Sequence, residues 1–86
     1  MSLLVDPPVW PGSGGLWSHL VSDVSYAELH DFADRVGIPA GAFHRDHYDL
    51  PAARYADVVS AGAQPVPSRE LVARLSAAGL RRRQPG

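Results

Sequence analysis

The chain of 86 residues contains no cysteine and no lysine. Without cysteine it can form neither a disulfide bond nor a thiolate metal site, so any metal would have to be bound by histidines and carboxylates. Without lysine it cannot form a Schiff base, and its eight basic residues are all arginines. A chain this short has a small core, because it buries only about 60–65% of the surface that its unfolded form exposes. We therefore expect one domain over residues 1–80, a basic tail at 81–86, and stabilisation as a homodimer.

Long apolar runs and a strong net charge are also absent. No segment reaches the roughly 18 apolar residues of a transmembrane helix, and the N-terminus lacks the charged and apolar regions of a signal peptide. These absences predict a cytoplasmic protein without membrane contacts. The net charge of -1 gives no overall attraction to nucleic acid, so contact with nucleic acid would depend on a local group of arginines.

The N-terminal part predicts a strand and then a long loop. The apolar run SLLVD (2–6) precedes two prolines, which cannot continue a β-ladder, so the strand is expected to end near Asp6. Residues 7–18 are rich in proline and glycine and predict a loop whose tryptophans form a lid or a dimer contact. The alternating pattern of residues 17–23 permits a strand but does not require one.

The rest of the chain predicts helices that alternate with short strands. Ser25 and Glu28 have the spacing of a capping box, and proline and glycine mark the ends of the later helices. Helices are expected at 26–36, from Pro51 to Gly62, and from an N-cap at Ser68 to Gly79; strands are expected at 43–48 and 63–66. This order favours an α/β fold in which three helices pack on a short, mostly parallel sheet of about three strands.

Polar residues follow each expected strand, and ligands of open α/β sheets bind at the carboxyl ends of the strands. His19, His47 and Asp49 would give mixed nitrogen and oxygen ligands for a divalent zinc, manganese or iron ion, or would act as acid and base. Asp6 and Asp23 are further ligand candidates at this rim. No spacing diagnostic of a metal family is present.

Some of these residues, and the other two histidines, also have an interpretation without function. Asp49 could accept backbone N–H bonds at the start of the second helix, and His30 could be a boundary residue hydrogen-bonded to a neighbour. His44 and Asp46 are expected on the solvated surface, and, if residues 43–48 form one strand, His44 lies on the opposite face from His47. A buried His19 would need a hydrogen-bonding partner in either case.

Arginines and aromatic residues are candidates for ligand binding. Arg54 and Arg69, each near a helix start, could bind an anionic ligand such as a phosphoester or nucleic acid, or could pair with a nearby acid. The run Arg81–Arg83 is typical of a solvated tail, with phosphate contact as the alternative. Trp17 and Tyr48 could contact a ligand at the rim, although a tyrosine there would equally suit the core.

Two motifs of known chemistry are missing. The chain has no G-x-S-x-G sequence, and Ser18 beside His19 would point to the opposite face of a strand. The glycine-rich GSGG (12–15) follows prolines and does not open onto a helix. We therefore expect neither a serine nucleophile nor a nucleotide-fold cofactor.

Five blocks together carry a family resemblance: VDPPVWP, WSHLVSD, ELHDFADRVGIP, HYDLP and GAQPVPSREL. Their order and spacing resemble a small bacterial and phage family catalogued as domain of unknown function 4031, over roughly residues 4–80. The family supplies no activity, but the resemblance raises particular residues as site candidates and leaves His44 and Asp46 outside the blocks. The residues carried over are Asp6, Trp17, His19, Asp23, Glu28, His30, His47, Tyr48 and Asp49, with Glu28 and His30 expected to support the ligands from behind.

Two functions are compatible with this pattern. The first is a hydrolase, metal-dependent in its leading form, that acts on a phosphoester or nucleic-acid substrate. The second is a binding or adaptor module without catalysis, in which the histidine and aspartate residues form a structural hydrogen-bond network.

Overall fold

The structure, a computed structural model, describes residues 2–82, so residues 83–86 of the expected basic tail lie outside it. The strands are β1 (Leu3–Val5), β2 (Trp10–Gly12), β3 (Gly15–Ser22), β4 (Phe43–His44), β5 (His47–Pro51) and β6 (Gln64–Pro65). The helices are α1 (Tyr26–Arg35), α2 (Tyr55–Ser60) and α3 (Ser68–Ala77), with short 3-10 turns at Ala40–Ala42 and Ala52–Arg54. The longest of these helices have ten residues, so none within residues 2–82 could cross a membrane.

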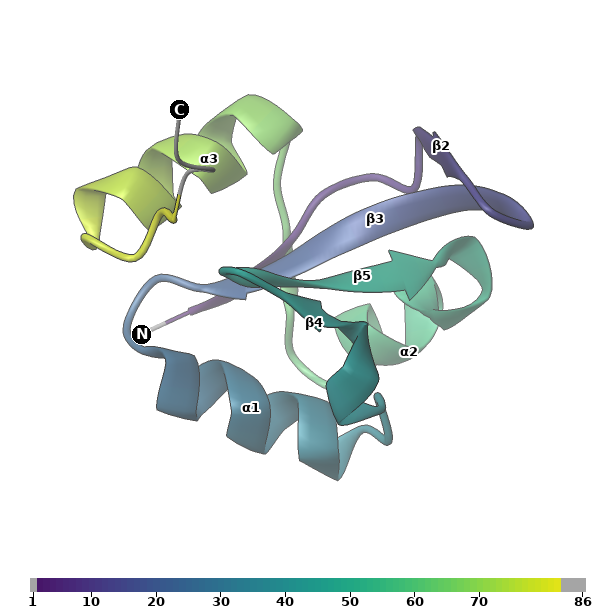
Figure 1. Cartoon of the computed structure of the whole chain (residues 1–86), viewed down its shortest axis with the longest axis horizontal. Helices are drawn as coiled ribbons and strands as arrows, with labels where there is room; N and C mark the ends of the chain where they lie inside the picture. The colour runs from purple at the N-terminus through teal and green to yellow at the C-terminus, as the bar shows by residue number, and fades with distance from the viewer. Residues whose placement is uncertain (1, 83–86) are drawn as a thin grey trace.

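The six strands form one mixed sheet. Its order is β4-β5-β3-β1-β6, with β2 paired to β3, and within residues 2–82 only the β1–β6 pair is parallel. The α/β class with three helices is confirmed, but the prediction of a short, mostly parallel sheet of three strands is wrong. The reason is that the chain turns back in two hairpins, β2–β3 and β4–β5 (Figure 1), and every neighbouring pair except β1–β6 is antiparallel.

The first hairpin replaces the predicted loop at 7–18. Gly14 and Gly15 have φ angles of 81° and 138°, which favour glycine, and they let β2 fold back on β3. Gly12 has a different constraint, because a Cβ atom there would lie 2.6 Å from Cδ1 of Trp17. The glycines therefore form a tight turn that sets Trp10 directly opposite Trp17 across the two strands.

The second hairpin divides the strand predicted at 43–48. Arg45 has a φ of 62° and lies in the turn between β4 and β5, which places His44 opposite His47. Cross-strand partners lie on the same face of a sheet. The expectation that these two histidines lie on opposite faces is therefore wrong.

The helices begin and end close to their predicted bounds, with two differences at their starts. Ser25 caps α1 by accepting a hydrogen bond from the Glu28 N–H at 3.0 Å, as predicted. Pro51 still pairs in β5, so α2 begins only at Tyr55, after a 3-10 turn. Ser68 is the first residue of α3 rather than its N-cap, and its hydroxyl group is used elsewhere.

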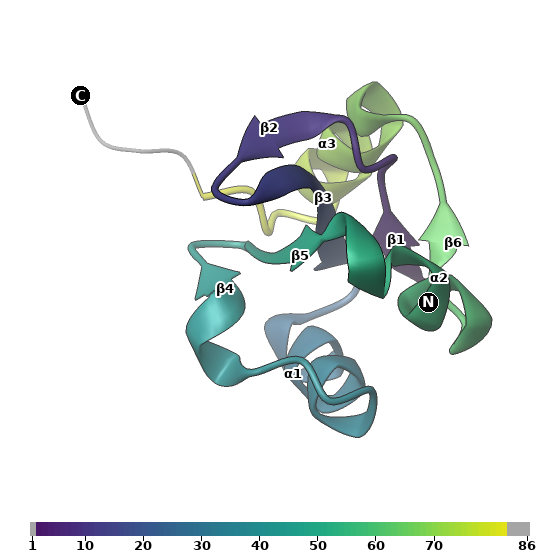
Figure 2. The same ribbon diagram turned by 90° about the vertical axis from the view of Figure 1, so that its right-hand side faces the viewer.

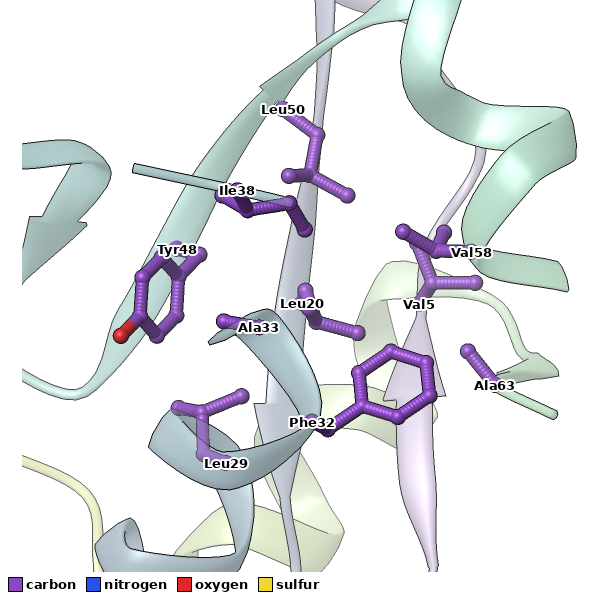
Figure 3. Packing of buried hydrophobic residues seen from close by; sticks show 10 residues of the cluster. All are labelled: Val5, Leu20, Leu29, Phe32, Ala33, Ile38, Tyr48, Leu50, Val58 and Ala63. Carbon is purple, nitrogen blue, oxygen red and sulfur yellow. The ribbon is translucent and has the colours of Figure 1, made fainter. Parts of the chain in front are cut away.

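Hydrophobic side chains fill both faces of the sheet. Helices α1 and α2 cover one face and α3 covers the other, as the two views show (Figures 1 and 2). The larger cluster lies between the sheet and α1 and α2 and is drawn in Figure 3: Val5, Leu20, Leu29, Phe32, Ala33, Ile38, Tyr48, Leu50, Val58 and Ala63. The smaller cluster lies under α3: Leu4, Val21, Val66, Leu71 and Leu75.

We predict different effects on stability when two buried serines of β3 are replaced by alanine. Ser22 donates to Glu28 and accepts from two backbone N–H groups, whereas the hydroxyl of Ser18 has no partner within residues 2–82. Replacing Ser22 by alanine should lower the free energy of unfolding by about 1–3 kcal/mol, and Ser18→Ala should leave it unchanged or raise it by up to about 1 kcal/mol. Urea denaturation measures both, and equal losses for the two variants would contradict this assignment.

Candidate metal centre

The alternation of side chains along two paired strands brings the first three candidate residues together. His19 of β3 pairs directly with Asp49 of β5, and His47 lies two residues before Asp49 on the same face. Their neighbours Leu20 and Tyr48 point into the core on the opposite face. The three polar side chains therefore lie on the face of the sheet that α3 covers in part.

The three side chains converge on a small volume. The Oδ1 atom of Asp49 lies 3.2 Å from Nε2 of His47 and 3.9 Å from Nε2 of His19. One ligand atom from each residue falls within 4.8 Å of the others. Ligand atoms about 2.0–2.2 Å from one ion are separated by roughly 3–4 Å, so small side-chain movements would suit this set to a single ion.

Behind His19 lies the buried carboxylate of Asp6, which is 1% exposed. Its Oδ2 atom accepts a hydrogen bond from Nδ1 of His19 at 2.9 Å, and its Oδ1 accepts one from the His19 backbone N–H at 2.6 Å. The indole of Trp10 and the hydroxyl of Ser68 donate to the same carboxylate at 3.1 and 2.7 Å. Asp6 therefore fixes both the position and the ring orientation of His19.

An equivalent pair holds His47. The carboxylate of Asp46, also 1% exposed, accepts a hydrogen bond from Nδ1 of His47 at 2.6 Å. Its other oxygen accepts from the backbone N–H of Arg82 at 2.8 Å and from the guanidinium of Arg81 at 3.4 Å. The segment after α3 thus folds over the β4–β5 turn and completes the environment of this carboxylate.

The pKa values of both pairs follow from these contacts. Burial raises the pKa of Asp6, but hydrogen bonds from His19 and Ser68 outweigh it and leave that pKa below its ordinary value. Burial likewise raises the pKa of Asp46, and hydrogen bonds from His47 and Arg82 bring it below the ordinary value. The hydrogen bond to Asp6 raises the pKa of His19, although burial of the ring opposes this. The two buried carboxylates are therefore charged at neutral pH.

The two pairs leave the same atom of each ring free. Because carboxylates bind both Nδ1 atoms, the Nε2 atoms of His19 and His47 are the ones directed at Asp49. Histidines that bind metals in proteins commonly donate their other ring N–H to a carboxylate in this way. The arrangement can hold a divalent ion on two nitrogens and one oxygen, with positions left for water.

Open space adjoins the three residues. A groove of about 290 Å³ is lined by His19 and Asp49 together with part of the β2–β3 hairpin: Trp10, Pro11, Gly12, Ser13 and Trp17. A smaller cavity of about 80 Å³ lies between His19, His47 and the side of α3 and is bordered by Arg81. The candidate centre is thus accessible from the side of the hairpin.

The comparison with known protein families agrees with the resemblance of the sequence blocks. The family model described as "Protein of unknown function (DUF4031)" matches residues 3–78. The chain belongs to DUF4031. No curated protein and no solved structure matches it. The family supplies no reaction, so the chemistry of this DUF4031 protein has to be argued from its own residues.

Three other candidate residues of the DUF4031 chain lie away from the cluster. Asp23 accepts hydrogen bonds from the backbone N–H of Ser2 and from Arg74, and so ties α3 to the end of β3. Glu28 accepts from Ser22 on the face covered by α1. His30 is hydrogen-bonded to the Tyr48 hydroxyl at 2.7 Å, also on that face, as a boundary histidine would be.

The arginine and aromatic candidates are divided in the same way. Arg54 donates to the carbonyls of Val36 and Gly37 after α1 and to Asp57, away from the centre. Arg69 is exposed in the first turn of α3, next to Ser68. Tyr48 belongs to the core, whereas Trp17 lines the groove beside Asp49.

Two of the interpretations without function are wrong. Asp49 caps no helix: no side chain caps the 3-10 turn that follows β5, and the Asp49 carboxylate lies against the two histidines. Asp46 is buried rather than solvated, because Arg81 and Arg82 return to it across 35 and 36 residues. No local pattern could have revealed this long-range contact. His44 is exposed, as expected.

The pairing of His19 with Asp6 predicts a measurable titration. In the metal-free protein, the pKa of His19 should lie above the ordinary value of about 6.5, because the Asp6 carboxylate stabilises the protonated ring. Asp6→Asn should lower it, since the charge is lost and burial remains. NMR titration of the ring protons measures both. Asp23→Asn is the matched control and should leave the pKa of His19 unchanged. A His19 pKa that stays the same in Asp6→Asn would contradict the pairing.

Proposed function

We propose that this protein is a metal-dependent hydrolase in which His19, His47 and Asp49 bind one divalent ion of zinc, manganese or iron. The observation that carries the proposal is the shared direction of the two rings. Both Nε2 atoms face one oxygen of Asp49, while the buried carboxylates of Asp6 and Asp46 occupy both Nδ1 atoms. Such carboxylate–histidine pairs fix the tautomer that a metal needs and increase the basicity of its ligands.

Two histidines and one carboxylate suit hydrolytic chemistry. Three protein ligands leave positions for a water molecule and a substrate, and a bound divalent ion makes that water acidic enough to supply a nucleophile near neutral pH. The groove beside His19 and Asp49 gives a substrate access to these positions. The two histidines and Asp49 would hold the ion, and the carboxylate of Asp49 would neutralise part of its positive charge.

The alternative of a purely structural network is less well supported. A structural network is normally buried and satisfies its members with protein partners. Here the side chain of Asp49 is 42% exposed, and the Nε2 atoms of the two histidines face it next to open space. Asp6 and Asp46 already hold the two rings in place through their Nδ1 atoms, so Asp49 is not required to orient them.

We favour a phosphoester as the substrate class because of Arg81. Arg81 borders the cavity beside His47; its Nη1 atom donates to Asp46 at 3.4 Å, and the other N–H groups of the guanidinium can bind an oxygen of a phosphoryl group. Arg54 does not contribute to this argument, because it is committed to the end of α1.

Metal analysis tests the centre directly. Protein purified without a histidine tag should hold about one divalent ion per chain, measured by mass spectrometry of the metals and by calorimetric titration of chelated protein. His47→Ala should abolish this binding, while His44→Ala, which removes the exposed cross-strand neighbour, should retain it. Asp46→Asn should weaken the metal affinity by roughly 10–100-fold through the orientation of His47. Equal binding by the His47→Ala and His44→Ala variants would sink the proposal.

Hydrolysis is a separate test of the reaction class. With its metal, the protein should cleave p-nitrophenyl phosphate or bis(p-nitrophenyl) phosphate, and chelation should stop the release of nitrophenol. Asp49→Asn should reduce kcat/KM by about 100-fold or more, because the ion would be lost or displaced. Asp57→Asn, at an exposed carboxylate paired with Arg54, serves as the control. Metal binding without turnover of either ester would reject the phosphoesterase and keep the metal centre.

A further inference from the structure

The groove beside the candidate centre is built largely from the two tryptophans of the β2–β3 hairpin. Trp10 and Trp17 line it together with His19 and Asp49, so a molecule that fills the groove also lies against two of the three proposed metal ligands. From this juxtaposition we propose that the groove binds a flat aromatic ring, and that the substrate is a nucleoside phosphate. The second part rests on the proposed function, whereas the first does not.

Both indoles are held in place before any ligand arrives. The Nε1 atom of Trp10 donates to Oδ2 of Asp6 at 3.1 Å and to Oγ of Ser68 at 3.2 Å. Trp17 donates to the carbonyl of Ser13 at 3.0 Å. Because these side chains are already fixed, ligand binding would cost little further side-chain entropy in the groove, and this favours affinity.

Trp17 is also fixed by shape. Its indole ring packs so closely on Gly12 that a Cβ atom at position 12 would lie 2.6 Å from Cδ1 of the ring. The turn glycines set the two strands in register, with Trp10 opposite Trp17. The hairpin sequence thus specifies two rigid rings at one end of the candidate centre.

The indoles offer their apolar surfaces rather than their N–H groups. Both N–H groups are used within the protein, and Trp10 remains 43% exposed. Apart from the two indoles, His19 and Asp49, the lining residue with a polar side chain is Ser13. A sugar ring, which needs several hydrogen-bonding partners for its hydroxyls, is poorly matched to such a lining. A nucleobase is well matched, because stacking on an aromatic side chain tolerates any base.

The size and place of the groove select a small molecule. Its volume of about 290 Å³ is at the low end of ligand sites, which suits one ring system rather than a polymer. A base stacked on the indoles would place the attached sugar phosphate toward His19 and Asp49. The phosphate ester would then meet the proposed ion, which links ring recognition to hydrolysis.

The two tryptophans make the test direct, because they are the only ones in the chain. In chelated, metal-free protein, adenosine and adenosine 5′-monophosphate should each quench the tryptophan fluorescence in a saturable way. Ribose 5-phosphate and glucose, which lack the flat ring, should not. Shifts of the indole N–H signals in NMR spectra check the result without any variant. Absence of an effect of adenosine on both signals, or equal effects of glucose, would overturn the proposal.

Variants locate the binding within the hairpin. Trp10→Leu should weaken adenosine binding about tenfold or more, whereas Trp10→Phe, which keeps an aromatic ring, should weaken it less. Stacking of one base on an aromatic side chain accounts for a change of this size. Leu16→Ala is the control for the integrity of the hairpin, since Leu16 is exposed on β3 and does not line the groove. If Trp10→Leu does not fold, the two remaining variants test the same point. Trp10→Phe should bind adenosine more weakly than Leu16→Ala, and equal binding by these two variants would contradict the proposal.

Metal loading separates this proposal from the proposed function. Added manganese should tighten binding of adenosine 5′-monophosphate about tenfold or more and leave adenosine unchanged. If adenosine binds but the protein holds no metal, the ring site stands and the hydrolase fails. If the metal binds and adenosine does not, the ring site fails and the hydrolase stands. If the metal and adenosine both bind but the metal does not increase the affinity for adenosine 5′-monophosphate, the nucleoside phosphate is rejected as the substrate.

Discussion

The buried carboxylate of Asp6 is the contact on which the other features of the centre depend. It follows β1 and accepts hydrogen bonds from the backbone and ring of His19 in β3, from Trp10 at the start of the hairpin, and from Ser68 at the start of α3. A charged group at 1% exposure is costly to bury unless hydrogen bonds replace its water. Four donors do so here, and together they hold a strand, a hairpin and a helix around one histidine.

The pairing of the strands also sets the position of the second histidine, His47. The antiparallel pairing of β3 with β5 sets His19 opposite Asp49, and the two-residue period of a strand puts His47 on the same face. Asp46 then holds His47 from the turn that precedes β5. The result is two carboxylate–histidine pairs on neighbouring strands, with α3 on one side and the tryptophan groove on the other. This explains how a chain without cysteine can bring together a compact set of side chains that could hold a metal ion.

Local signals were sufficient for the helices but not for the sheet. Ser25 and Gly37 mark the two ends of α1 through contacts within a few residues, and these signals can be read directly from the sequence. Strand direction depends on which segments meet, and the alternation of strands and helices suggested parallel pairing. The glycines at 14 and 15 reversed the chain within the segment expected to be a loop. The ligand candidates were brought together all the same, because the register, rather than a shared strand end, aligns His19 with Asp49.

The sequence by itself determined the chemistry available to this protein: histidine and carboxylate ligands, no thiolate, no lysine, and tryptophans beside a glycine-rich segment. It also determined the helices, whose signals are local. Only the tertiary structure decided which residues share a face and which carboxylates are buried. Asp46 shows why, since its burial depends on Arg81 and Arg82, 35 and 36 residues away. Contacts over such separations arise from the packing of the whole chain, so no short pattern encodes them.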